Sequence, residues 1–382
     1  MERFCSLFSQ IVSVVSRARF AQLVRQHRSD RHARGFTSWE QFASMLLCHL
    51  GRMHSLREIE HGLNSAGGKL SHIGVKRAPR STLSYANEHR PWELYRSLFY
   101  EVLELCRVAG SRHKFRFKNK LLSIDSTTIE VVSEMYDWAL HNKSKGAIKL
   151  HTMLDHDDFL PVFVNVTDGQ TADITAGRAM PLPAGAIVVF DRGYIDYTWF
   201  KKLTEEKVFF VTRLKKNCSY TVIEERPAPR GVVRDEIVEV FNRRAGRVRS
   251  YVPLKLRRVE IIDDEGKPLA FFSNHLTLGA TTIARIYKDR WQIELFFKAL
   301  KQNLKIKTFI GTSANAIQIQ VWTALTAMVI LSYLKRRSGC PWSLSNLFAM
   351  LRLHLFGYYD LWKWIAEPFA SPPTPDLQLA LT

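Results

Sequence analysis

The chain has 382 residues, and its 46% hydrophobic content is enough to build the cores of two or three domains. Its formal net charge of +19 favours a nucleic acid as partner over an anionic membrane surface. The five cysteines (Cys5, Cys48, Cys106, Cys218 and Cys340) are scattered with no CxxC pair, which argues against a disulfide framework and a zinc site and indicates a reducing compartment.

The N-terminus and the longest apolar stretch predict an intracellular, soluble protein. The first residues mix acid and base and lack the apolar run and small-residue cleavage site of a signal peptide. The apolar stretch at 321–334 contains Thr and Ser and is shorter than the roughly 20 residues that span a bilayer, so we expect a buried helix there.

Residues 1–115 are expected to form a helical domain that binds DNA. Thr37 and Glu40 have the spacing of a capping box that opens a helix. The basic run at 76–81 precedes another helix, and a helix N-terminus is a good position for phosphates. A purely structural helical cap is the alternative for this region. The expected helices cover 4–16, 37–50, 56–63, 82–89 and 92–108.

The next hundred residues predict an α/β fold. Residues 121–126, 147–154 and 160–166 form apolar or alternating segments typical of an antiparallel three-strand meander. The runs at 186–191 and 208–212 are continuously apolar, as in buried parallel strands, and a helix at 194–206 lies between them. Three antiparallel strands followed by a β-α-β unit indicate a ribonuclease-H-like sheet.

After this sheet the pattern changes to short, charged, alternating segments, which predict a mostly β insertion at 213–275. Helices at 287–301, 314–334 and 343–355 follow, and the Pro-rich tail after Glu367 is expected to be disordered. The predicted domains are a helical domain at 1–115, a catalytic domain at 116–212 and 276–340, the insertion at 213–275, and C-terminal helices with the tail at 341–382.

The stretch at 287–301 is expected to form one amphipathic helix with two distinct faces. Its apolar face is Ile286, Ile293, Phe296, Phe297, Leu300 and Leu304. Its polar face carries one carboxylate among cations and aromatic rings: Tyr287, Trp291, Glu294, Lys298, Lys301 and Lys305, with Arg290 at the edge. Such a face is suited to gripping phosphates around a metal ligand.

Three acids are candidates for a metal site. Asp125 and Asp191 both end buried strands, and the carboxyl edge of an α/β sheet is where ligands bind. Adjacent carboxylates repel unless a cation lies between them, and Mg²⁺ prefers oxygen ligands. Glu294, on a helix that packs across the sheet, would complete a set that supports in-line displacement at phosphorus with two metal ions.

These residues resemble the DDE transposases of the insertion-sequence-four family. The family's signature of Tyr, Arg, Glu and Lys is matched at every spacing by Tyr287, Arg290, Glu294 and Lys301. The family's two Asp contexts are matched by the segments S123-I-D-S-T127 and D191-R-G-Y194. The likeness covers about residues 110–335, and the N-terminal region matches only in its helical, basic character.

The resemblance implies that Asp125, Asp191 and Glu294 are catalytic residues that bind Mg²⁺ or Mn²⁺, two ions per site. It implies that Tyr287, Arg290 and Lys301 hold DNA phosphates, and Trp291 is expected to stack on a displaced base or to form an ordinary rim contact. The protein is then a prokaryotic, cytoplasmic, nucleoid-associated transposase. It would act as a homodimer on terminal inverted repeats and target DNA, with excision through a hairpin.

Other readings remain open at this point. A ribonuclease-H-like nuclease or resolvase would cut without joining, an inactive derivative would only bind DNA, and a tyrosine recombinase would use Tyr287 as a nucleophile. A further group of potential metal ligands falls on a predicted hairpin turn, where Asp is favoured for backbone reasons: His151, Asp155, His156, Asp157 and Asp158. Lys149 and His151 are expected to face the site from a strand, and Asp137 and Asp173 are acids without an assigned role.

Overall fold

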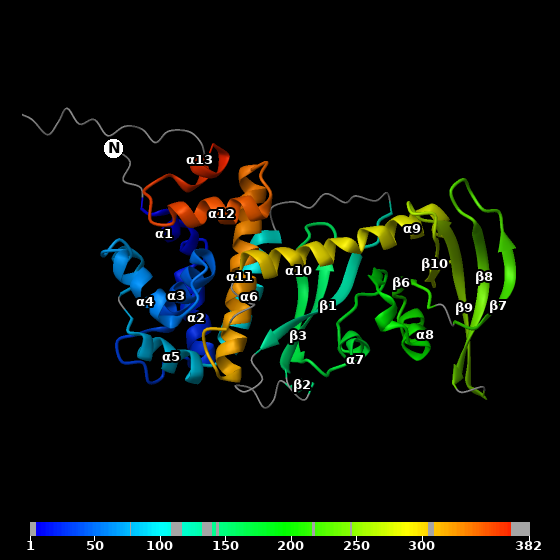
Figure 1. Cartoon of the computed structure of the whole chain (residues 1–382), viewed down its shortest axis with the longest axis horizontal. Helices are drawn as coiled ribbons and strands as arrows, with labels where there is room; N and C mark the ends of the chain where they lie inside the picture. Colours follow the sequence, from blue (N-terminus) through cyan, green and yellow to red (C-terminus); the bar gives the residue numbers. More distant parts are fainter. Residues whose placement is uncertain are drawn as a thin grey trace, which may run out of the picture. The chain divides into compact units, whose positions relative to one another are not determined.

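The computed structural model describes residues 5–76, 78–107, 117–131, 140–142, 145–215, 218–244, 247–304 and 309–367. The chain divides into two compact units (Figure 1). The helical unit consists of the described residues within Met1–Gly110 and Lys298–Thr382. The sheet unit consists of those within Ser111–Ser133 and Asp137–Phe297.

Most helices of the helical unit begin with a side-chain cap. Its helices are α1 (Leu7–Val12), α2 (Arg17–His27), α3 (Ser38–Gly51), α4 (Leu56–Ser65), η1 (Ser71–Ile73), α5 (Arg80–His89), α6 (Glu93–Arg107), α11 (Ala314–Ser338), α12 (Leu344–His354) and α13 (Leu361–Ala366). The predicted capping box is confirmed, because the Thr37 hydroxyl accepts from the Glu40 amide and the Glu40 carboxylate accepts from the Thr37 amide. Helix α2, which the sequence analysis did not predict, is capped by Ser16.

Helix α11 forms the centre of the helical unit. It packs against α3, α5 and α6, so nearly every residue from Ala316 to Leu331 is buried (Figure 1). Within the described residues it is the one helix long and apolar enough to cross a membrane, but 83% of its most apolar window is buried inside the structure. It therefore has the character of a core helix, as its sequence predicts. The described residues of 298–304 and 309–340 cluster with the helical unit.

The sheet unit contains ten strands in one sheet. They are β1 (Leu121–Val131), β2 (Leu140–Asn142), β3 (Lys145–Asp155), β4 (Pro161–Asp168), β5 (Ile187–Phe190), β6 (Phe209–Arg213), β7 (Tyr220–Arg226), β8 (Arg234–Arg244), β9 (Arg247–Ile262) and β10 (Pro268–Ser273). Their order is β2-β3-β1-β5-β6-β10-β9-β8-β7, and β4 also pairs with β3. The helices of this unit are α7 (Asp173–Arg178), η4 (Arg192–Tyr194), α8 (Tyr197–Glu205), α9 (Ala280–Asp289) and the first part of α10 (Trp291–Asn303).

The predicted mixed α/β sheet is confirmed. Strands β1, β3 and β4 are antiparallel neighbours, and β5 and β6 add parallel to β1. The apolar run of β5 is continuous because both faces of this strand are covered. Val188 and Phe190 pack in the core that contains α8, whereas Ile187 and Val189 pack in the core that contains α9.

The β-rich segment that follows β6, expected as a mostly β insertion, continues the main sheet. Strand β10 pairs antiparallel with β6 and carries β9, β8 and β7 outward from it. Two buried ion pairs cross the β8–β9 pair: Arg257 binds both oxygens of Asp235 at 2.7 and 2.6 Å, and Arg258 binds Glu236 at 2.7 Å. These charges explain why the segment reads as polar although much of it is buried.

The expected single helix at 287–301 consists of two helices, because α9 ends and α10 begins at Arg290. Arg290 keeps helical dihedral angles, and the break is a local tightening in which the Ile293 amide bonds to the Arg290 carbonyl. All six residues of the predicted apolar face are buried, so the assignment of faces is confirmed. Lys305, Asp137 and the tail after Glu367 lie outside the described residues.

Candidate active site

The strand register places Asp125 and Asp191 side by side. In the parallel pair β1–β5, Ile124 lies opposite Phe190, so the two aspartates are the next residues on neighbouring strands. In the parallel pair β5–β6, Phe190 lies opposite Thr212, which puts Arg213 at the same edge. Two carboxylates and one guanidinium therefore come from three adjacent strand ends.

The turn after Asp191 depends on a glycine. The Asp191 carboxylate caps the short helix η4 by accepting the Gly193 amide hydrogen at 2.8 Å. A Cβ atom at position 193 would lie 2.9 Å from the same carboxylate oxygen, closer than real Cβ atoms come. This close approach explains the Asp-Arg-Gly sequence: the glycine lets the carboxylate fold back onto the turn at the sheet edge.

Glu294 is linked to Asp125 through Arg290. One guanidinium nitrogen lies 3.0 Å from Asp125 Oδ2, and the other lies 2.5 Å from Glu294 Oε1. The Arg290 side chain is only 12% exposed, and its Nε has no hydrogen-bond partner among the described residues. Since the spacing from Arg290 to Glu294 is i to i+4, the start of α10 holds this pair in place.

The carboxylates affect one another electrostatically. Burial raises the pKa of Asp125 to about 6, and the negative charges of Asp191 and Glu294 act in the same direction. The Ser126 amide and the Arg290 guanidinium act in the opposite direction by stabilising the ionised form. A cation near this carboxyl group would stabilise its ionised form.

The chemistry of this donor set fits a divalent metal ion. Asp125 and Glu294 both bind Arg290, Asp191 follows the strand next to β1, and hard cations such as Mg²⁺ take oxygen ligands of this kind. Among the residues that the structure describes, no three acids, histidines or cysteines are already gathered closely enough to hold a metal. The Arg290 guanidinium supplies the positive charge between Asp125 and Glu294 instead.

The residues predicted to contact DNA lie around these acids in different environments. Tyr287 is half-buried, with its ring 4.9 Å from the Phe271 ring and 5.5 Å from the Arg290 guanidinium carbon, and burial raises its pKa. Trp291 is 56% exposed at the start of α10. Lys301 lies two turns after Glu294 on the same helix. The Arg290 guanidinium forms ion pairs with Asp125 and Glu294.

A second polar cluster lies directly behind Asp125. Asp173, in the first turn of α7, accepts the Ser126 hydroxyl at 2.7 Å and pairs with Lys149 at 3.2 Å. His151 is fully buried nearby, and burial lowers its pKa to about 4. The buried Tyr194 hydroxyl is adjacent, and burial together with the charge of Asp125 raises its pKa. Sequence analysis expected Lys149 and His151 to face the site, but they pair with Thr128 and Ser126 and so lie on the other face of the sheet from Asp125; it gave Asp173 no role.

The acids of the β3–β4 hairpin serve the backbone, as predicted. Asp155 accepts from the Asp157 amide and pairs with Lys120 at 2.9 Å, and Asp158 accepts from the Leu160 amide. His156 bonds to the Ser123 hydroxyl.

Comparison with known proteins identifies the class. The family model described as the transposase DDE domain matches residues 116–330, more than half of the chain, and this chain belongs to that family. It is a DDE-type transposase, an enzyme that acts on DNA and depends on a divalent metal ion. A second model, described as a domain of unknown function, matches residues 5–76.

Two relatives found by sequence agree with this class. The chain is 33% identical over 252 residues to a Sinorhizobium fredii protein named as the transposase y4zB, covering 65% of this chain and 69% of that protein. It is 28% identical over 286 residues to a Geobacillus stearothermophilus protein named as the transposase for insertion sequence element IS5377, covering 75% and 74%. The solved piggyBac transposase synaptic complex with hairpin DNA aligns at 12% identity and a TM-score of 0.42, covering 97% of this chain and 81% of that chain.

Proposed function

We propose that this DDE transposase binds the terminal inverted repeats of its own insertion sequence as a dimer. It cuts the element's ends and uses the freed 3′-hydroxyl groups to attack target DNA. Asp125, Asp191 and Glu294 are the catalytic residues and would hold Mg²⁺ or Mn²⁺, two ions per site. The catalytic domain is ribonuclease-H-like, and the protein acts in the cytoplasm on nucleoid DNA.

One observation supports this proposal: two strand-end acids and one helix acid, far apart in sequence, are linked by the strand register and by Arg290. Asp125 and Asp191 follow register-paired residues of β1 and β5, and Glu294 reaches the same guanidinium as Asp125. A purely structural ion pair would need only one of these acids. The order β4-β3-β1-β5-β6 supports the ribonuclease-H-like assignment, because it combines the antiparallel meander with the parallel β-α-β unit.

The chain's own residues contribute position and charge. When bound, divalent ions supply Lewis-acid stabilisation of the attacking and leaving oxygens in an in-line displacement. The Gly193 amide fixes the Asp191 carboxylate, and Asp173 fixes the hydroxyl next to Asp125. Arg290 balances the acids when their charge is not otherwise compensated, and its second role is at a phosphate of the DNA end.

The remaining signature residues lie along α9 and α10, next to the acids. We infer that Tyr287, Arg290 and Lys301 hold phosphates near the cleaved end and that the exposed ring of Trp291 stacks on a base. The intact spacing of Tyr287, Arg290, Glu294 and Lys301 supports membership of the insertion-sequence-four group, in which excision proceeds through a hairpin.

The test is cleavage of a duplex that carries an end of the element. Asp191→Ala is expected to abolish Mg²⁺-dependent cleavage while retaining end binding, because the change removes a metal ligand but no phosphate contact. Asp264→Ala is the matched control, since Asp264 is 97% exposed and pairs, among the residues that the structure describes, with exposed Lys288 at 3.5 Å. Normal cutting by Asp191→Ala would show that the carboxylate triad is not the active site.

A second measurement addresses the phosphate contacts. Lys301→Ala is expected to weaken binding to the DNA end and to reduce the slope of log affinity against log salt by about 1. Lys288→Ala serves as control because its side chain is 80% exposed on the neighbouring helix. An unchanged slope in Lys301→Ala would remove this residue from the phosphate contacts.

The runner-up is a nuclease that cuts without joining. Transfer of a cleaved end into a second duplex by the purified protein separates the two functions. The tyrosine-recombinase reading requires a nucleophilic Tyr287, and the raised pKa and half-buried ring of this residue argue against it. A covalent protein–DNA adduct formed without metal would support that reading.

A further inference from the structure

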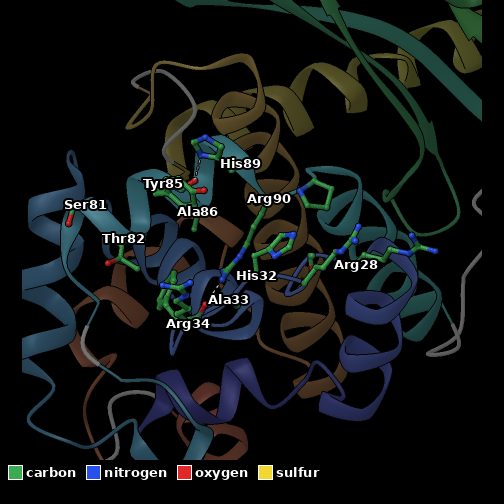
Figure 2. A pocket seen from close by; sticks show the side chains of 14 residues that line it. Arg28, His32, Ala33, Arg34, Ser81, Thr82, Tyr85, Ala86, His89 and Arg90 are labelled. Atoms are coloured by element: carbon green, nitrogen blue, oxygen red, sulfur yellow. Dashed lines mark hydrogen bonds between the residues drawn. The ribbon is translucent and has the colours of Figure 1, made fainter.

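The helical unit contains a basic hollow far from the acids in sequence. A cavity of about 700 Å³ lies between α5 and the loop that follows α2. Figure 2 shows the side chains of this loop, including Arg28, His32 and Arg34, together with those of α5 and with Arg90. The fourteen described residues that line it include four arginines and two histidines but no Asp or Glu.

The arginines of the hollow differ in their partners. Arg90 has a structural role: it donates to Gln41 Oε1 at 3.0 Å and to the Phe36 carbonyl, and Asp30 lies 3.7 Å away. Arg28, Arg31 and Arg34 are exposed and form no ion pair with any residue that the structure describes. Three neighbouring cations without a carboxylate are available to an anion.

The α5 side of the hollow provides donors and a flat ring surface. Ser81 and Thr82 lie in the first turn of α5, which has no side-chain cap. One turn later the rings of Tyr85 and His89 stack at 4.0 Å with an angle of 18° between their planes, and His89 Nδ1 donates to the Tyr85 carbonyl at 2.9 Å (Figure 2). Tyr85 is 66% exposed, so the stacked pair presents an aromatic face beside the cations.

This combination selects a particular form of nucleic acid. Cations take phosphates of any DNA, but an aromatic face takes a base only when the base is unstacked from its neighbours. A duplex keeps its base faces covered, whereas a single strand or a melted end exposes them. The cavity volume falls within the range of pockets that accept small ligands, so a nucleotide can enter where a double helix cannot.

We propose that this hollow binds an unpaired nucleotide of single-stranded or melted DNA. Arg28, Arg31 and Arg34 hold the phosphates, and the stacked pair of Tyr85 and His89 receives the base. The inference rests on the proposed function, since it assumes that this unit handles the element's DNA, and it adds a single-strand site separate from the three acids.

The test compares binding of fluorescent oligothymidylate and of a duplex without element sequences to the full-length protein. Tyr85→Ala is expected to weaken oligothymidylate binding about tenfold, because stacking of one base is lost, and to leave duplex binding within about twofold. Tyr85→Phe, which keeps the ring, should bind both probes like the parent protein. Retained thermal melting of each variant excludes unfolding as the cause.

The cations are tested with a pair of double variants that lose equal charge. Arg31→Ala with Arg34→Ala should reduce the salt slope for oligothymidylate by about 1.4, the value for two single-strand phosphate contacts. Arg19→Ala with Arg57→Ala removes two exposed arginines of α2 and α4 outside the hollow and should leave the slope unchanged.

The outcomes separate this inference from the proposed function. If the parent protein binds duplex DNA but Tyr85→Ala and the Arg31/Arg34 variant bind oligothymidylate as tightly as the controls, the hollow is not a nucleotide site. The same conclusion follows if the parent protein binds only duplex. If the parent protein binds neither probe nor its own element's ends, the proposed function itself fails.

Discussion

Arg290 compensates the charge of the acids in this structure, and its removal gives a specific prediction. Arg290→Ala leaves Asp125 and Glu294 without the guanidinium that lies 3.0 and 2.5 Å from them. Removing one partner of a fully buried ion pair costs about 3–5 kcal/mol, and the two carboxylates here are 18% and 32% exposed. After allowance for this exposure we expect a loss of about 2 kcal/mol.

The assay is thermal unfolding with and without saturating Mg²⁺. In a unit of this size, a loss of about 2 kcal/mol lowers the melting temperature by about 4–8 °C. A divalent cation among the same acids should restore much of this loss, because it replaces the missing positive charge. Mg²⁺ should therefore raise the melting temperature of Arg290→Ala more than that of the parent protein.

Lys288, two residues before Arg290, provides the control variant. Lys288→Ala also removes one positive charge, but from an 80% exposed side chain, and it should change neither the melting temperature nor the response to Mg²⁺. If Arg290→Ala melts like Lys288→Ala, or gains no more from Mg²⁺ than the parent protein, Arg290 does not compensate the charge of the acids.

Three further predictions concern other parts of the molecule. Burial lowers the pKa of His49 to about 3, whereas the unfolded chain binds this proton near pH 6.5. The free energy of unfolding should therefore fall by about 1.4 kcal/mol per pH unit as the pH drops from 6.5 toward 3. His49→Gln should remove this slope in acid-unfolding measurements, whereas His61→Gln, at an exposed position, should keep it. Asp235→Ala should destabilise the protein by about 3–5 kcal/mol in denaturant titrations, because it leaves the buried Arg257 without its carboxylate partner. A loss of stability no larger than that of Glu224→Ala, which removes one partner of an exposed pair, would contradict this argument. Asp173→Asn should slow end cleavage about tenfold at unchanged DNA binding, because Ser126 and Lys149 lose a charged partner beside Asp125; a parent-like rate would limit Asp173 to a structural role.

Local patterns were sufficient to predict most elements and the two aspartates. The capping box at Thr37 and the apolar run before Asp191 each depend on residues close in sequence, and the structure has both. The apolar runs of β1 and β5 each end at an aspartate, so the adjacency of Asp125 and Asp191 followed once the strands were assigned as parallel neighbours.

Strand pairing and helix packing between distant parts of the chain could not be predicted from the sequence. The pairing of β10 with β6 joins residues about 60 positions apart and adds the β-rich segment to the main sheet. The charged residues of this segment did not indicate that it is buried, because Asp235 and Glu236 are neutralised by arginines on the next strand. The packing of α11 on α3 and α6 likewise depends on surfaces brought together by folding.

The contacts of Arg290 and Asp173 in the site were not predicted for a similar reason. Arg290 was expected at a phosphate because its spacing matches a signature, but spacing does not reveal that it can neutralise Asp125 from another element. The cluster of Asp173, Ser126 and Lys149 draws one residue each from α7, β1 and β3, so no local motif marks it.

The register of β1 against β5 also determines which genetic lesions the site can survive. A point substitution in the apolar residues 121–124 would disturb packing but leave the carboxylate at the strand end. Loss of a single codon there would bring Ser126 to the position opposite the end of β5, next to Asp191, and move Asp125 to the other face of the sheet. Such an in-frame deletion would leave a strand that still pairs while the catalytic carboxylate is lost from the edge, so copies of the element can be silenced without a stop codon or a frameshift.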